Sequence, residues 1–126
     1  MSNQQMKIDI TYTYKCKIVR IIDGDTIVCN IDLGFGTWIH DEHVRLARIN
    51  TPETRTKDLN EKRRGYEAKQ FTEDIIYSSS EIRLKTYKDH GKYGRYVADV
   101  FVKFGDNWIC VNDRLVESRN AEYVEY

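Results

Sequence analysis

Apolar and polar residues alternate in the first part of the chain, which is the pattern of strands that bury one face. Three stretches show it and are rich in β-branched and aromatic residues: Thr11–Ile22, Thr26–Leu33 and Trp38–Ile49. Asp23-Gly24-Asp25 separates the first two stretches, and such a turn signal between two strands predicts a hairpin. Pro52 follows the third stretch, and proline ends a strand because it has no N–H to donate.

The apolar period changes to that of a helix between Asp58 and Ser80. One helical face carries Ala68, Phe71 or Thr72, Ile75 and Ile76. Gly65 should weaken the first half of this helix, because glycine loses more backbone freedom on folding than other residues. Alternation resumes at Glu81–Thr86 and at Arg95–Phe104, which predicts a fourth and a fifth strand. A short helix from about Val111 to Glu117 completes the pattern.

Three strands, a helix, two strands and a second helix predict one domain of the α+β class, mainly β with helices. The order fits a small OB-fold barrel of five antiparallel strands, with a helix inserted after the third strand and a short helix near the C-terminus. Neither a linker nor an internal repeat interrupts the pattern. We expect residues 1–12 to form a polar lead-in and residues 13–126 to form the folded domain.

The bulk composition allows one compact core, because 40% of the 126 residues are hydrophobic. The 20 basic and 20 acidic residues cancel, which argues against a protein that holds nucleic acid by bulk positive charge. A local basic cluster in a cleft is still compatible with this balance. Such a cluster exists, because five lysines and arginines lie between Arg83 and Arg95 against one aspartate.

The N-terminal ten residues lack the apolar core of a signal peptide, and no apolar run approaches the length of a membrane span. We therefore expect a cytoplasmic or intracellular protein without a membrane partner, and we leave its oligomeric state open. The three cysteines, Cys16, Cys29 and Cys110, have no metal-binding spacing, which favours free, buried thiols. A Cys16–Cys29 disulfide across the predicted hairpin is the minor alternative.

Three segments gather metal ligands and anion-binding side chains at predicted strand ends: Ile22–Thr26, Val44–Thr54 and Lys88–Arg95. Each alone is compatible with an ordinary surface turn, strand edge or charged loop. Together they supply carboxylate and other oxygen ligands, a candidate general base and two arginines, which phosphodiester hydrolysis requires. Arg45 and Arg48 should point to opposite sides of their strand, so we expect only one of them to face such a site.

Four motifs resemble those of the staphylococcal nuclease (micrococcal nuclease, thermonuclease) family: IDGDT at 22–26, VRLARINTPET at 44–54, GYEAKQFT at 65–72 and KYGR at 92–95. Each motif alone is weak evidence, but their shared order and spacing over residues 13–126 is specific. The resemblance implies an OB-fold enzyme that hydrolyses phosphodiester bonds in DNA, RNA or both with low sequence specificity, using calcium.

The resemblance also implies roles for individual residues. The expected metal ligands are Asp25, Asn50 and, through its backbone carbonyl, Thr51. The expected catalytic residues are the general base Glu53 and the phosphate-binding arginines Arg45 and Arg95. The expected substrate-binding residues are Lys92 and Tyr93. Asp23 is expected to support the turn that carries Asp25.

Asn50 stands where the family usually has an aspartate, so calcium should bind more weakly and magnesium or manganese are alternatives. This departure favours a second hypothesis, a catalytically silent OB-fold module that binds nucleic acid or a protein. The joint presence of Asp25, Arg45, Glu53 and Arg95 favours the enzyme, since binding alone requires no carboxylate facing a phosphate. Trp38 and Trp108 we assign to packing, and Tyr123 and Tyr126 either to packing or to base contacts.

Overall fold

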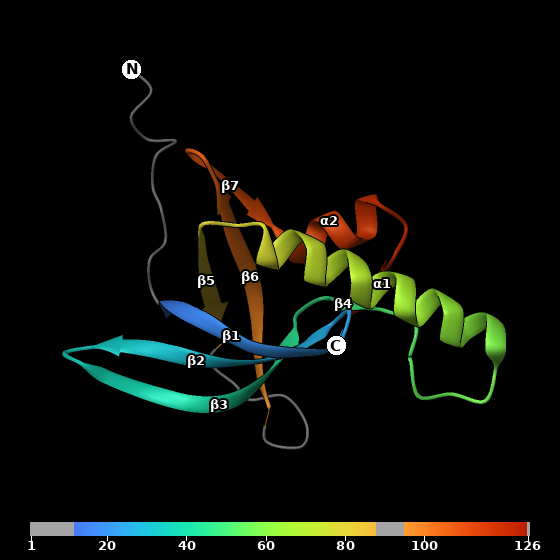
Figure 1. Ribbon diagram of the computed structural model, residues 1–126, viewed down its shortest axis with the longest axis horizontal. Coiled ribbons are helices and arrows are strands. Elements are labelled where there is room, and N and C mark those ends of the chain that lie inside the picture. Colours follow the sequence, from blue (N-terminus) through green and yellow to red (C-terminus); the bar gives the residue numbers. More distant parts are fainter. Residues whose placement is uncertain (1–11, 88–94, 126) are drawn as a thin grey trace.

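The computed structural model describes residues 12–87 and 95–125, which form a curved barrel of strands with two helices beside it (Figure 1). The barrel strands are β1 (Thr13–Asp23), β2 (Thr26–Gly34), β3 (Thr37–Leu46), β5 (Glu81–Thr86) and β6 (Tyr96–Phe104). Three shorter strands are β4 (Ile49–Asn50), β7 (Asn107–Cys110) and β8 (Glu122–Tyr123). The helices are α1 (Leu59–Tyr77) and α2 (Val111–Glu117).

Hydrogen bonds join six strands into one sheet in the order β3-β2-β1-β5-β6-β7. β3 also pairs with β6 from Val44–Tyr96 to Leu46–Ala98, and this pairing closes the barrel. The predicted five-stranded OB-fold barrel is therefore confirmed. One detail of the prediction is wrong, because the closing pair runs parallel whereas the other barrel pairs are antiparallel.

On β6, buried and half-buried residues alternate as the sequence pattern predicts. On β2, the four successive residues Thr26–Cys29 are all buried. The fully buried large side chains include Ile27, Val44, Leu46, Leu84, Val100 and Val102 from the strands. Ile76 from α1 and Leu115 from α2 join the same cluster. Both helices therefore contribute apolar residues to the core of the barrel.

Helix α1 begins one residue later and ends three residues earlier than the sequence pattern predicts. Asp58 is its N-cap, and the Asp58 carboxylate accepts hydrogen bonds from the backbone N–H groups of Asn60 and Glu61. The buried residues on α1 are Gly65, Ala68, Thr72 and Ile76, which matches most of the predicted face. Gly65 lies in the first half of the helix, as expected, and is buried there.

The third strand is shorter than predicted, because it ends at Leu46 and not at Ile49. Arg48 follows with a φ of 69°, a left-handed conformation that interrupts the strand. The chain then resumes as β4, where Asn50 pairs with Glu122 of β8. A two-residue strand carries too little alternation to be recognised in a sequence, so β4 and β8 were not predicted.

The three cysteines are free, as the sequence favours, and no disulfide joins Cys16 to Cys29. A hydrogen bond with Cys29, together with burial, raises the pKa of the Cys16 thiol. Burial raises the pKa of the half-buried Cys110 thiol to about 11. Cys16 and Cys110 therefore stay protonated near neutral pH and are poor nucleophiles. Within residues 12–87 and 95–125, neither helix has the length and apolar character needed to cross a bilayer.

Asn112 is fully buried at the start of α2 and bonds that helix to the barrel. Its side-chain oxygen accepts a hydrogen bond of 2.9 Å from the Val100 N–H, and its amide donates one of 2.9 Å to the Ala47 carbonyl. The same amide lies 3.2 Å from the Ala98 carbonyl. The Ala98 carbonyl also accepts a hydrogen bond of 2.8 Å from the Ala47 N–H, so the buried groups that Asn112 serves above all are the Val100 N–H and the Ala47 carbonyl.

We expect Asn112→Ala to lower the free energy of unfolding by about 2–4 kcal/mol, because it leaves buried backbone groups unsatisfied. Urea denaturation followed by circular dichroism measures this loss. The matched control is Asn107→Ala in β7, where the asparagine is exposed and the change should stay within about 0.5 kcal/mol. Equal losses in the two variants would contradict the role given to Asn112.

Candidate active site

The turn between β1 and β2 lies directly against helix α1. A Cβ atom at Gly24 would come within 2.9 Å of the Ala68 Cβ, so this close approach requires glycine. The buried Thr72 hydroxyl donates a hydrogen bond of 2.8 Å to the Gly24 carbonyl. The turn that carries Asp23 and Asp25 is therefore held in place by the helix.

The segment that carries Glu53 packs on the same helix, one turn nearer its N-terminus. A Cβ atom at Gly65 would lie 2.5 Å from the Glu53 carbonyl oxygen, which leaves no room for any side chain there. The Thr54 hydroxyl donates a hydrogen bond of 2.6 Å to the Asp23 carboxylate. Asp23 thus links the two segments.

Asp25 is 7% exposed, and both of its carboxylate oxygens accept hydrogen bonds. Oδ1 accepts from the Thr26 hydroxyl at 3.0 Å, and Oδ2 accepts from the Thr51 backbone N–H at 3.0 Å. The Arg45 guanidinium lies 3.1 Å from Oδ2 and forms an ion pair with it. These contacts fix the direction of the carboxylate before any ligand arrives.

Arg45 connects the two side chains that the sequence assigns to a metal. Its Nη2 donates a hydrogen bond of 2.7 Å to the Asn50 side-chain oxygen and also lies beside Asp25. Its Nη1 donates one of 2.8 Å to the Leu46 carbonyl. One guanidinium nitrogen therefore contacts both an amide oxygen and a carboxylate oxygen at the expected metal position.

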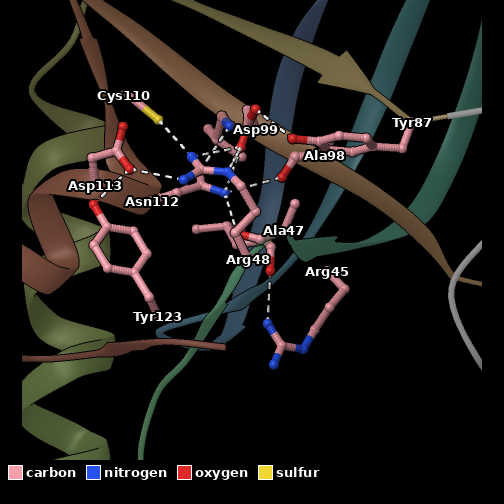
Figure 2. A network of polar contacts seen from close by, with 12 residues as sticks. Arg45, Ala47, Arg48, Tyr87, Ala98, Asp99, Cys110, Asn112, Asp113 and Tyr123 are labelled. Atoms are coloured by element: carbon pink, nitrogen blue, oxygen red, sulfur yellow. Dashed lines mark hydrogen bonds and ion pairs between the residues drawn. The ribbon is translucent and has the colours of Figure 1, made fainter. Parts of the chain in front are cut away.

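Arg48 points away from Arg45, as expected, and enters a separate polar network shown in Figure 2. Its guanidinium lies 2.9 Å from Asp99 of β6 and 3.1 Å from Asp113 of α2. The Tyr123 hydroxyl donates a hydrogen bond of 2.9 Å to Asp113. Desolvation opposes ionisation of Asp113, but the hydrogen bonds from Tyr123 and Arg48 outweigh it and lower the pKa of Asp113.

This network determines where β4 lies, because Arg48 directly precedes it and Tyr123 pairs with it. The Val124 N–H also donates a hydrogen bond of 2.8 Å to the Arg48 carbonyl. Tyr123 is thereby an anchor for the tail, and its contacts are with Asp113 and Arg48. Arg48 and its partners were not recognised from the sequence, since their spacing of 51 and 65 residues is visible only in the fold.

One cleft of about 330 Å³ collects the predicted site residues. Its lining consists of Asp23, Asp25, Thr26, Arg45, Asn50, Thr51, Pro52, Glu53, Glu61 and Arg95. All seven predicted residues within the described part of the chain are in this lining. Lys92 and Tyr93 lie outside the described residues.

Glu61 is a member of this cleft that the sequence analysis missed. One of its carboxylate oxygens accepts a hydrogen bond of 3.3 Å from the Thr56 hydroxyl, and the other lies 3.5 Å from the Glu53 N–H. Glu61 stands three residues after the N-cap Asp58, a spacing that is typical of helix starts. The spacing of Asp58 and Glu61 therefore indicated the start of a helix, and it did not indicate that Glu61 belongs to the cleft.

A larger groove of about 450 Å³ continues from the cleft and shares Asn50, Thr51, Pro52 and Glu61 with it. Three arginines and three glutamates line this groove, so its formal charge is zero. The cleft itself differs in charge. Its four carboxylates outnumber its two arginines, which leaves two formal negative charges in the described lining.

The donors in the cleft are hard oxygen atoms, which suit calcium, magnesium or manganese rather than a soft metal. Asp25 and Asn50 offer side-chain oxygens, and the Thr51 hydroxyl is buried without a hydrogen-bond partner in the described structure. Within residues 12–87 and 95–125, no three His, Cys, Asp or Glu side chains cluster closely enough to hold a metal by themselves. The donor chemistry therefore fits a hard cation that completes its coordination with carbonyl groups, water or substrate.

Comparison with known proteins finds a matching family model and several relatives. Residues 43–126 match the family model described as staphylococcal nuclease homologue. The chain is 34% identical over 95 residues to a thermonuclease of Staphylococcus intermedius, an alignment that covers 75% of this chain and 51% of the relative. It is 31% identical over 87 residues to a thermonuclease of Staphylococcus hyicus, which covers 68% and 47% respectively.

A third relative is an uncharacterized protein of Methanocaldococcus jannaschii, which is 28% identical over 136 residues. That alignment covers 92% of this chain and 62% of the relative. The chain therefore spans about half to three fifths of the length of the curated relatives that it matches.

Gly65→Ala tests the contact between α1 and the Glu53 segment. We expect the added methyl group to displace the Glu53 backbone and to lower the free energy of unfolding by about 1–3 kcal/mol, as overpacking typically does. Chemical denaturation measures the loss. Tyr66→Ala is the control, because Tyr66 is the exposed neighbour on the same helix. A Gly65→Ala variant as stable as the control would show that the contact is not tight.

Proposed function

Because the chain belongs to the staphylococcal nuclease homologue family, we propose that it is a metal-dependent nuclease. It hydrolyses phosphodiester bonds in DNA, RNA or both, with low sequence specificity. Calcium is the proposed ion, and magnesium and manganese are the alternatives. The observation that carries this proposal is the meeting of Asp25, Arg45, Glu53 and Arg95 in one cleft.

The charge of the cleft supports the requirement for a metal ion. Two net negative charges in the described lining would repel a phosphodiester, which is itself an anion. One divalent cation offsets these two charges. It would also polarise the phosphate and lower the barrier to attack. Asp25, Asn50 and the Thr51 carbonyl would hold such an ion.

The side chains of the cleft then have distinct tasks. Arg45 and Arg95 bind the phosphate oxygens and stabilise the extra negative charge that develops when water attacks. Glu53 accepts the proton of the attacking water, which turns that water into a stronger nucleophile. Arg45 is prepared for its task because Leu46, Asn50 and Asp25 already fix its guanidinium.

The second candidate function is a silent module that binds nucleic acid or protein without cleaving it. One observation favours it, the contact between Arg45 and Asn50. The Asn50 side-chain oxygen already accepts a 2.7 Å hydrogen bond from Arg45. A neutral ligand that is already hydrogen-bonded competes poorly for a cation, because calcium affinity follows ligand charge.

Cleavage of single-stranded DNA and of RNA by the purified chain tests the proposed function. We expect cleavage with millimolar calcium, magnesium or manganese and none with chelator. Glu53→Gln should slow cleavage by about 100-fold or more, because it removes the general base. Glu67→Gln, an exposed glutamate on α1, is the matched control and should retain full activity. Full activity in Glu53→Gln would exclude the role given to Glu53, and inactivity with all three metals would favour the silent module.

Asn50→Asp tests the proposed metal site independently of catalysis. The new carboxylate should tighten calcium binding by about tenfold, or about 1.4 kcal/mol, because it adds a formal negative charge beside Asp25. Isothermal titration calorimetry without substrate measures this affinity. Asn107→Asp in β7 adds the same charge at an exposed position that does not line the cleft, so it should leave calcium binding unchanged. Equal affinities in wild type and Asn50→Asp would place the ion elsewhere.

A further inference from the structure

A basic surface lies on the outside of the barrel, on residues that do not line the proposed cleft. Four residues define this outer basic face: Lys15 of β1, Arg83 of β5, Lys103 of β6 and Trp108 of β7. They lie side by side because the strands pair in this order, with Lys15 opposite Arg83 and Lys103 opposite Trp108. The residues between them along the strands, such as Cys16 and Leu84, face the core.

Trp108, which the sequence analysis assigned to packing, lies on this face and is 40% exposed. The Arg83 guanidinium lies 4.8 Å from the centre of the Trp108 ring, and the Lys103 ammonium lies 5.8 Å from it. Both distances are typical of cation–π contacts. The face therefore presents an accessible indole beside two positive charges.

Glu81 is the acidic residue within this face. Its carboxylate is 2.7 Å from the Arg83 guanidinium. In the sheet, Glu81 lies opposite Lys103 of β6. The hydrogen bond from Arg83 lowers the pKa of Glu81, and the charges of Lys15 and Lys103 add to this effect. Three cations therefore surround one carboxylate, and the face has an excess of positive charge although the whole chain is neutral.

A similar pair of a lysine and a tryptophan lies on the outer surface toward β3, at the other end of the strand order. Lys17 follows Lys15 on the same face of β1, and its ammonium lies 5.4 Å from the centre of the Trp38 ring on β3. The surface from Trp38 to Trp108 crosses six neighbouring strands, a path of about 24 Å at about 4.8 Å per strand. It carries a tryptophan at each end, the cations Lys17, Lys15 and Arg83 between them, and two carboxylates, Glu81 beside Arg83 and Asp32 opposite Trp38.

We propose that the outer basic face binds single-stranded nucleic acid at a second site, separate from the cleft. The cations contact phosphates, and the indole of Trp108 stacks on a base. The choice of nucleic acid as the occupant rests on the proposed function. The charge of the face supports it independently, because a polyanion complements three cations that surround one carboxylate.

The combination of residues favours a nucleic acid strand over other anionic partners. Aromatic side chains between lysines and arginines are typical of surfaces that bind single strands without sequence preference, because every base has a face that can stack. A membrane surface is usually bound by an apolar helix face or a cluster of basic residues with inserted side chains. Here both tryptophans lie on strands, at the two ends of a path of about 24 Å.

Binding of short, labelled oligothymidylate and oligouridylate in the presence of chelator tests the inference without cleavage. Fluorescence anisotropy should show that the double variant Arg83→Gln, Lys103→Gln binds about 5- to 20-fold more weakly than wild type. The slope of log affinity against log salt should fall by about 1.4, because each lost phosphate contact on a single strand contributes about 0.7.

The matched control is the double variant Lys62→Gln, Arg114→Gln, which removes the same charge from exposed positions on the two helices. Arg114 is paired with Glu117 much as Arg83 is paired with Glu81, so the control also breaks one ion pair. Control and wild type should bind alike. Equal affinities of all three proteins would overturn the inference.

Stacking has a separate readout, because the chain contains two tryptophans. In Trp38→Phe the remaining fluorescence comes from Trp108, and we expect oligonucleotide to quench it. Absence of quenching, with Kd values unchanged in Trp108→Ala, would exclude base stacking at this face. Vesicles that contain an anionic phospholipid form another arm of the test. Binding to vesicles but not to oligonucleotide would identify a lipid surface and overturn the inference.

Hydrolysis of bis(p-nitrophenyl) phosphate separates this inference from the proposed function, since this small diester needs only the cleft. We expect the Arg83→Gln, Lys103→Gln variant to retain wild-type hydrolysis of it with metal. If the wild-type protein is inactive but its oligonucleotide binding depends on Arg83 and Lys103, only the nuclease proposal is overturned. If the protein is active but its oligonucleotide binding does not depend on Arg83 and Lys103, only the second site is overturned.

Discussion

The close approach of helix α1 to two backbone segments is the constraint on which the cleft depends. Gly24 touches Ala68, and Gly65 touches the carbonyl of Glu53, at separations that no larger residue could keep. These contacts bring the β1–β2 turn and the segment after β4 to the same helix. The hydrogen bond from Thr54 to Asp23 then joins the two segments directly. Interiors packed this closely transmit displacement, so a change on α1 reaches both loops of the site.

Arg45 shows why side-chain geometry matters more here than a tally of charged residues. Its guanidinium stands between Asp25 and Asn50, so a positive charge already occupies part of the space that a cation would enter. An aspartate at position 50 would attract both that guanidinium and a metal ion more strongly than the neutral Asn50 amide does. The residue at position 50 therefore influences how tightly the protein itself holds Arg45, and so how readily the guanidinium can bind a phosphate.

Short-range patterns predicted the strands of the barrel and the polar segments that contribute to the cleft, whereas the individual site residues followed from the family resemblance. Alternation marks strands, and Gly24 and Pro52 mark the loops where polar residues collect. The sequence did not predict the parallel β3–β6 closure or the Arg48 network, because partners 51 and 65 residues apart leave no periodic signal. Glu61 was missed for another reason, since helix capping explains its position as well as a site does.

The neutral total charge of the chain conceals two surfaces of opposite sign. The described cleft has an excess of carboxylates, whereas the outer basic face has three cations around one carboxylate. Salt screens exposed charges beyond about 8–10 Å, so a bound strand responds to the residues that it touches and not to the sum over the molecule. An argument from net charge excludes bulk attraction only. The two proposed sites, one that binds a strand and one that cuts it, are therefore formed by different residues, on surfaces whose charges cancel only in the total.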